Sequence, residues 1–245
     1  MSQPQPIILY DIPCTTSGRT WSPNTMKTRY CLSYKGLAFT TLWVEFPQIA
    51  PLLESKGLKR PASGTYTLPA IEDPSTGSII ADSLDIARYL DITYPHTPAL
   101  LPEGTLAMLD KVYGAFASVA KSSMIFAVVG AEKLNPESKV YYHRTRGERY
   151  GKEWEKLTSL EHRERLVRVG LESAREAWDD LDRLYGENAG PFVLGESPCF
   201  VDFVVASRIK FIDLVLGPME VEEIHSLHGG RWGRLVEDLD KYFKY

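Results

Sequence analysis

The sequence has few cysteines, no long hydrophobic run and no excess of positive charge. Its three cysteines, Cys14, Cys31 and Cys199, are odd in number and widely spaced, which excludes a disulfide-stapled scaffold and a zinc site built on close cysteine pairs. No stretch reaches the roughly 20 apolar residues that a bilayer-spanning helix needs. The net charge of -4 provides no field that would gather a nucleic-acid backbone. We therefore expect free thiols, no membrane and no nucleic acid as partner.

A recognisable targeting segment is also lacking. Met1 to Pro6 contains no basic residue, and the apolar run from Ile7 to Tyr10 is too short for the core of a signal peptide. Together with the unpaired cysteines, this favours a cytoplasmic protein. Hydrophobic residues make up 44% of the chain and charged residues 24%, which is typical of a folded globular protein with room for two domains in 245 residues.

Short strand-like and helix-like segments alternate over residues 1–95. The predicted order is strand, helix, strand, helix, two strands and helix, because apolar runs alternate with segments that carry helix start and stop signals. The predicted elements are Ile7 to Tyr10, Pro23 to Tyr34, Ala38 to Glu45, Gln48 to Lys56, Tyr66 to Asp73, Ser78 to Ala81 and Ser83 to Tyr94. Pro95 ends the last helix because its ring cannot continue it.

The rest of the chain has helical length and composition. Residues 96–104, with Pro98 and Pro102, are expected to link a first domain, 1–95, to an all-helical domain, 105–245. The predicted helices are Thr105 to Val129, Trp154 to Tyr185, Phe200 to Leu216 and Arg231 to Phe243. The polar, basic segment Asn135 to Gly151, which contains Arg144, Arg146 and Arg149, is expected to be a solvated loop or a short helix without a partner.

The most informative segment for chemistry surrounds Ser22 and Pro23. Serine is a favourable N-cap and proline a favourable first helical residue. The Ser22 hydroxyl would therefore lie where unpaired N–H groups and the positive end of the helix meet, a position that stabilises anions. Helix capping alone explains the same residues.

Two further segments add to this pattern. Proline inside a predicted strand, at Leu68-Pro69, indicates an edge or a cis bond at a kink, which leaves backbone groups of Leu68 free for an extended peptide ligand. Asp82 and Ser83 precede the next helix and can cap it or hold a carboxylate. Each signal is weak alone, and an ordinary edge strand and an ordinary cap are the alternatives.

In this order and spacing, the motifs resemble those of the glutathione transferase superfamily over nearly the whole chain. Gly195 and Phe200-Val201-Asp202 also match that superfamily. More narrowly, Ser22-Pro23-Asn24-Thr25 followed by Tyr34-Lys35-Gly36 is similar to the fungal-specific class A transferases, which are related to bacterial β-etherases. The resemblance implies an α+β protein, with a thioredoxin-like N-terminal domain (βαβαββα) before an all-α domain. It also implies a homodimer, with glutathione as co-substrate and no metal.

The resemblance also implies roles for single residues. Ser22 would hydrogen-bond the glutathione sulfur and stabilise its thiolate, the nucleophilic form. The main chain of Leu68, with Pro69 in cis, would pair with the cysteinyl backbone of glutathione. Asp82 and Ser83 would hold the γ-glutamyl carboxylate and amine.

Other residues are weaker candidates. Ser17 and Thr25 are the alternative hydroxyls near the sulfur, and Asn24 is a further candidate for contact with glutathione. The candidates for the glycyl carboxylate are Lys56, Lys59 and Arg60. The walls of a pocket for a hydrophobic electrophile would come from Met26, Tyr113, Met124 and Phe126.

Four functions stay open at this point. The first is conjugation or peroxide reduction with hydrophobic or aromatic electrophiles. The second is a ligandin that binds aromatic compounds such as plant or wood phenolics with little turnover, and the third is glutathione-dependent cleavage of β-aryl ethers. The fourth is thiol exchange through Cys14, in a Cys14-Thr15-Thr16-Ser17 segment that resembles a glutaredoxin site but does not cap the following helix. One departure from the superfamily pattern is Cys199, a poor cap in the place of Ser or Thr.

Overall fold

The computed structural model describes residues 5–16, 18–62, 64–158 and 163–244. The suggested sulfur neighbour Ser17 lies outside these residues. A four-stranded sheet has the order β2-β1-β3-β4 and contains β1 (Ile7–Asp11), β2 (Phe39–Trp43), β3 (Ala70–Asp73) and β4 (Ser78–Ala81). In β1, Leu9 pairs in parallel with Thr41 and in antiparallel fashion with Ile71. The run Ile7–Asp11 is central and buried, as expected of a continuous apolar strand.

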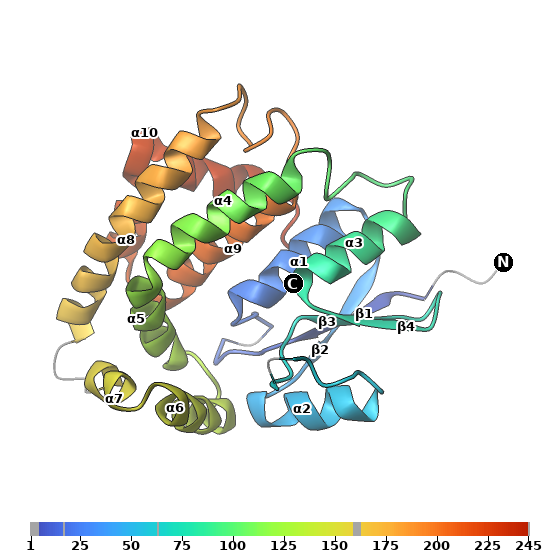
Figure 1. Ribbon diagram of the computed structural model, residues 1–245, viewed down its shortest axis with the longest axis horizontal. Helices are drawn as coiled ribbons and strands as arrows, with labels where there is room; N and C mark the ends of the chain where they lie inside the picture. The colour runs from blue at the N-terminus through green and yellow to red at the C-terminus, as the bar shows by residue number, and fades with distance from the viewer. Residues whose placement is uncertain (1–4, 17, 63, 159–162, 245) are drawn as a thin grey trace.

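Helices cover both faces of this sheet (Figure 1). Helices α1 (Pro23–Tyr34) and α3 (Ser83–Thr93) lie side by side on one face, and α2 (Phe46–Ser55) lies on the other. Gly36 has a φ of 68°, so the chain turns after α1 in a conformation that glycine adopts without strain. This βαβαββα unit is a thioredoxin-like arrangement, and the predicted order is confirmed.

In the described residues after α3, the regular elements are helices. The helices are α4 (Thr105–Ser118), α5 (Ala120–Ala131), α6 (Pro136–Tyr150), α7 (Lys152–Thr158), α8 (Arg163–Tyr185), α9 (Phe200–Val215) and α10 (Pro218–Asp240). Helix α9 is buried along nearly its whole length and packs on α1, where the rings of Tyr30 and Phe203 stack 5.3 Å apart. The predicted fold class is confirmed, whereas the limits at residues 96 and 104 stay a prediction.

Several predicted helices differ from the observed ones. The single helix expected from Thr105 to Val129 is two helices, because the backbone leaves helical geometry at Val119 (φ -112°, ψ 35°). The segment expected from Trp154 to Tyr185 contains α7 and α8. Helix α10 begins at Pro218 and contains a non-helical bend from Leu227 to Gly230, so it is longer than the helix expected from Arg231.

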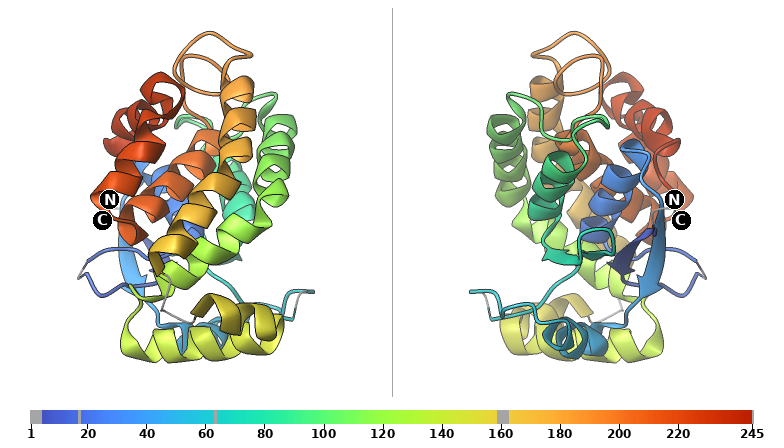
Figure 2. Two further views of the ribbon diagram at one scale, coloured as in Figure 1. Left: turned by 90° about the vertical axis from the view of Figure 1, so that its left-hand side faces the viewer. Right: turned by 90° about the vertical axis from the view of Figure 1, so that its right-hand side faces the viewer.

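The largest difference concerns Asn135 to Gly151, which forms the 15-residue helix α6. Helix α6 packs against α2, and Figure 2 shows that the two helices cross. The contact is polar at its start: the buried Ser138 hydroxyl accepts from the Phe46 N–H at 2.8 Å, and Asn135 donates to Glu45 at 2.7 Å. A helix with few apolar residues is thus held in place by hydrogen bonds to the other part of the chain.

Cys199 itself is the N-cap of α9. The Asp202 carboxylate accepts from the backbone N–H of Cys199 at 2.8 Å and of Val193 at 2.9 Å. Asp202 therefore supplies the reciprocal half of a capping box, in which the N3 carboxylate accepts from the backbone N–H of the N-cap residue. Across the described ranges, no single helix has the length and apolarity to cross a bilayer; only the bent pair Thr105–Ser118 and Ser122–Ala131 passes that test, and only when joined.

Candidate functional site

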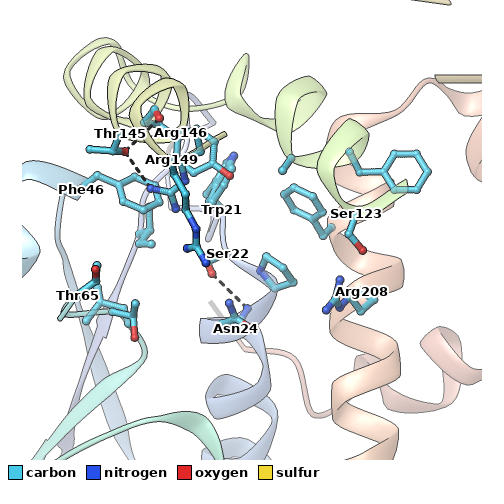
Figure 3. Close-up of a pocket in the computed structure, with 18 of the residues that line it drawn as sticks. Trp21, Ser22, Asn24, Phe46, Thr65, Ser123, Thr145, Arg146, Arg149 and Arg208 are labelled. Atoms are coloured by element: carbon cyan, nitrogen blue, oxygen red, sulfur yellow. Dashed lines mark hydrogen bonds between the residues drawn. The ribbon is translucent and has the colours of Figure 1, made fainter. Parts of the chain in front are cut away.

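A cavity of about 1090 Å³ opens between the two parts of the chain (Figure 3). Its walls come from the start of α1, from α2, from the loop before β3, and from α4, α5, α6, α8 and α9. The polar helix α6 forms one side of it next to α2. The cavity is large enough for two small molecules to lie together, since common ligand pockets measure about 300 to 1,000 Å³.

Ser22 lies at this cavity as the N-cap of α1. Its hydroxyl oxygen accepts from the backbone N–H of Asn24 at 3.2 Å, and its side chain is 4% exposed. Among the described residues, none accepts the Ser22 hydroxyl proton. The geometry therefore combines a hydroxyl donor with the positive end of a helix at a cavity wall, which favours an anion there.

Leu68 also lines the cavity, and the Leu68–Pro69 peptide bond is cis as the resemblance implied. Within the described ranges, neither the N–H nor the carbonyl of Leu68 has a hydrogen-bond partner, whereas the Pro69 carbonyl accepts from the Asp82 N–H at 3.2 Å. An extended segment at a cavity wall whose backbone groups are free can pair with an extended peptide.

Asp82 and Ser83 stand beside this edge but do not line the cavity itself. The Asp82 side chain accepts from the N–H groups of Leu84 and Asp85, so it caps α3. Its φ of 77° is rare for a residue with a side chain. Such strain is common at ligand-binding positions, where the surrounding structure holds it in place.

The weaker candidates separate into two groups. Asn24 and Arg60 line the cavity. Thr25 does not, because its hydroxyl is fully buried and bonded to Thr20 and to the Ser22 carbonyl. Lys56 is also elsewhere, since its ammonium lies 2.7 Å from Glu72. Lys59 is exposed and outside the cavity lining.

The expected walls for an electrophile are partly wrong. Phe126 lines the cavity, but Met26, Tyr113 and Met124 do not. Met26 belongs to the buried core, Met124 packs against that core, and Tyr113 is 37% exposed. Apolar periodicity could not separate core from cavity wall for these side chains.

Aromatic residues that the sequence analysis did not single out form much of the wall. Trp21 contacts the rings of Phe46, Tyr142 and Phe211 at centroid distances of 5.6, 5.3 and 5.5 Å. Its indole N–H donates to the Gly130 carbonyl at 2.7 Å, which ties the start of α1 to α5. The position of Trp21 directly before Ser22 is the one signal that could have pointed to it.

Four arginines line the cavity, and the sequence analysis gave a role to only one of them, Arg60. Arg146 and Arg149 point from α6 into the cavity, in the direction of Ser22, and Arg208 enters from α9 on the opposite side (Figure 3). Arg60 completes the set. The spacing of three between Arg146 and Arg149 places both on one face of a helix. The sequence analysis expected a solvated loop or a short helix without a partner there, so this spacing was not used to predict a site.

Cys14 does not line the cavity and is 4% exposed, with its thiol 3.5 Å from the Thr16 carbonyl. Thiol exchange through Cys14 therefore finds no support in this geometry. Within the residues described, no group of three or more His, Cys, Asp or Glu side chains gathers in a way that would hold a metal ion.

Comparisons with known proteins agree with this fold. Residues 21–93 match the model of the glutathione S-transferase N-terminal domain, and residues 107–242 match that of the C-terminal domain. The glutathione S-transferase-like protein ustS of Aspergillus flavus is 34% identical over 225 residues, which cover 86% of this chain and 81% of that protein.

Solved structures are similar over almost the full length. A glutathione S-transferase of Ceriporiopsis subvermispora, in complex with glutathione, has a TM-score of 0.86 and 32% identity, covering 97% of this chain and 99% of that one. GSTFuA3 from Phanerochaete chrysosporium has a TM-score of 0.84 and 32% identity, covering 99% of each chain. The chain belongs to the glutathione S-transferase family.

Proposed function

We propose that this chain binds glutathione in the cavity and transfers its thiolate to hydrophobic electrophiles, with Ser22 as the group that stabilises the sulfur anion. The observation that carries the proposal is the position of the Ser22 hydroxyl. It lies at the N-terminus of α1 and at the cavity, and no described residue accepts its proton. Support for glutathione as the ligand comes from the relative of Ceriporiopsis subvermispora, which was solved with glutathione.

The proposed chemistry needs little from the protein beyond charge stabilisation. A thiol is mostly protonated at neutral pH, and the thiolate is the nucleophile. The Ser22 hydroxyl and the helix end stabilise the charged sulfur, so the thiol proton passes to solvent on binding. The thiolate then forms a bond to the electrophilic carbon, and the leaving group departs with its bonding electron pair.

The other contacts follow from the same placement. The free backbone groups of Leu68 pair with the cysteinyl part of glutathione, and Asp82 and Ser83 at the start of α3 hold its γ-glutamyl end. Arg60 is the one glycyl-carboxylate candidate of the three that lines the cavity. A homodimer is part of the proposal, and light scattering tests it against the mass of 27.6 kDa for one chain.

Ser22→Ala tests the central role. Loss of a hydrogen bond to a charged group costs about 1.5 to 3 kcal/mol, so the pKa of the bound thiol should rise by about one to two units. Ultraviolet titration of the thiolate at saturating glutathione measures this shift. Ser22→Thr keeps a capping hydroxyl and is the matched control. An unchanged thiol pKa in Ser22→Ala would remove Ser22 from the mechanism.

Ligand storage is the second candidate, favoured by the size of the cavity and its aromatic wall. Tight binding of an aromatic compound with negligible glutathione-dependent turnover would make storage the main role. Release of a phenol from a β-aryl ether in the presence of glutathione would instead identify ether cleavage.

A further inference from the structure

The charged side chains of the cavity are unbalanced. Four arginines and one glutamate, Glu148, line it. The Glu148 carboxylate is bound by Arg144 in an exposed ion pair at 2.9 Å. For the four arginines, the described part of the chain contains no carboxylate within ion-pair distance. The protein as a whole carries a net charge of -4, so this surplus of positive charge is local to the cavity.

Arg208 is the most constrained of these cations. It projects from the largely buried helix α9, and its guanidinium carbon lies 4.6 Å from the centroid of the Phe116 ring. Its side chain is half-buried, and burial lowers its pKa. The wall of the same cavity also contains apolar residues, including Trp178 and Ile212. A guanidinium has five N–H donors, and stacking on Phe116 satisfies none of them.

A second cation lies close behind this wall. Lys27 is 5% exposed, and its ammonium donates to Asn24 Oδ1 at 2.9 Å. Burial, and then the charge of Arg208, lower the pKa of Lys27 to about 8, against a smaller opposing effect of Asp82. Two cations that repel one another, one of them buried, are costly unless an anion joins them.

Asn24 adds a neutral donor at the same place. Since its Oδ1 accepts from Lys27, the amide NH2 group is the part of the side chain left for the cavity that Asn24 lines. A guanidinium and an amide donor therefore face the cavity on its α1 and α9 side, in the positive field of Lys27.

We infer that the second substrate is an aromatic compound that carries an anionic group, a carboxylate in the simplest case, with the anion bound by Arg208 and the ring against Phe116 and Trp178. As a statement about an electrophile, this rests on the proposed function. The carboxylates of glutathione have other proposed partners, in Arg60 and at Asp82 and Ser83. Arg208 comes from the helical part of the chain and lies across the cavity from the α6 arginines.

A matched pair of substrates tests the inference. 4-Chloro-3-nitrobenzoate and 4-chloro-3-nitrobenzamide react with glutathione at the same carbon: a C–S bond forms, chloride leaves with the electron pair, and the thiol proton goes to solvent. For each compound, kcat/KM is divided by the rate constant of its uncatalysed reaction with glutathione. This ratio removes the difference in intrinsic reactivity between the two rings. A charged hydrogen-bonded contact is worth about 10-fold to 100-fold, so the native protein should favour the carboxylate by at least about 10-fold.

Two variants locate the effect. Arg208→Gln should abolish the preference, by lowering the carboxylate value at least about 10-fold more than the amide value. Arg168→Gln is the matched control, because Arg168 is an exposed arginine paired with Glu223 and does not line the cavity. It should keep the preference. Equal normalised values for the two substrates in the native protein would overturn the inference while leaving the proposed function intact.

A binding measurement distinguishes failure of the anion-site inference from failure of the proposed function. Calorimetry with the unreactive pair 3-nitrobenzoate and 3-nitrobenzamide needs no turnover. If neither chloro compound is conjugated, the proposed function falls, and a carboxylate preference in binding that is lost in Arg208→Gln still supports the anion site. Equal affinity for the benzoate and the benzamide would refute the site in either case.

Discussion

The guanidinium of Arg29 donates from Nε and Nη2 to the same oxygen of Asp11, at 2.9 and 2.8 Å, with both side chains fully buried. Arg29 also donates to the Lys244 carbonyl and the Thr41 hydroxyl, and the other Asp11 oxygen accepts from Thr20. This pair joins β1, β2, α1 and the C-terminal segment. It therefore holds α1, the helix whose N-cap is Ser22, in its position on the sheet.

Removing one member of this pair should be strongly destabilising. Arg29→Met leaves Asp11 as a buried carboxylate without its counter-ion, which costs about 3 to 5 kcal/mol. Urea unfolding should show this loss of free energy. The double variant Asp11→Asn, Arg29→Met should lose less than the sum of the two single changes. Arg88→Met, in an exposed pair with Asp85, should change stability by less than about 1 kcal/mol; a similar loss there would refute the argument.

Asp202 should matter more than the cysteine that it caps. Asp202→Ala leaves the buried N–H groups of Val193 and Cys199 without their acceptor, at a cost of about 2 to 4 kcal/mol. Cys199→Ser keeps the carboxylate and supplies a better cap, so its effect should stay within about 1 kcal/mol. Thermal or urea unfolding of both variants measures the difference. Equal losses would place the stabilisation on the thiol instead.

Lys27 should give stability a distinct pH dependence. Its pKa is lowered from 10.5 to about 8 in the folded protein, so the unfolded chain binds more protons between these values. The stability of the native sequence should then rise with pH in this window relative to Lys27→Met, by up to about 3 kcal/mol. Below pH 8 the cost of the buried charge is fully present. Lys111→Met, at an exposed site, is the control; parallel curves for all three proteins would contradict the assignment.

The thiols of the protein should be inert in the native state. All three cysteines are buried, and burial raises the pKa of the Cys31 and Cys199 thiols, which disfavours their reactive thiolates. A chromogenic disulfide reagent should therefore react with the native protein at least about 100-fold more slowly than with the chain unfolded in guanidinium chloride. In the unfolded chain all three thiols should react. A fast-reacting Cys14 would revive thiol exchange as a function.

The order of elements was predictable because it depends on local signals. The apolar run of β1, the Ser22-Pro23 start of α1 and Pro95 after α3 each act over a few residues. The break between α4 and α5 at Val119 was not predictable, because neither glycine nor proline marks it in the sequence. Helix α6 was missed for a related reason: its sequence has a weak apolar face, and its position depends on Glu45, more than 80 residues earlier in the chain.

The candidate site shows the same division. The sequence by itself determined a serine at a helix start, a proline edge beside it and an acidic cap on the third helix, because each is a property of neighbouring residues. Only the tertiary structure decided which charged side chains reach the cavity. Arg208 follows Ser22 by 186 positions and lies on a largely buried helix. Its place at the cavity depends on the packing of α9 against α1, which brings this guanidinium to the cavity that the serine lines.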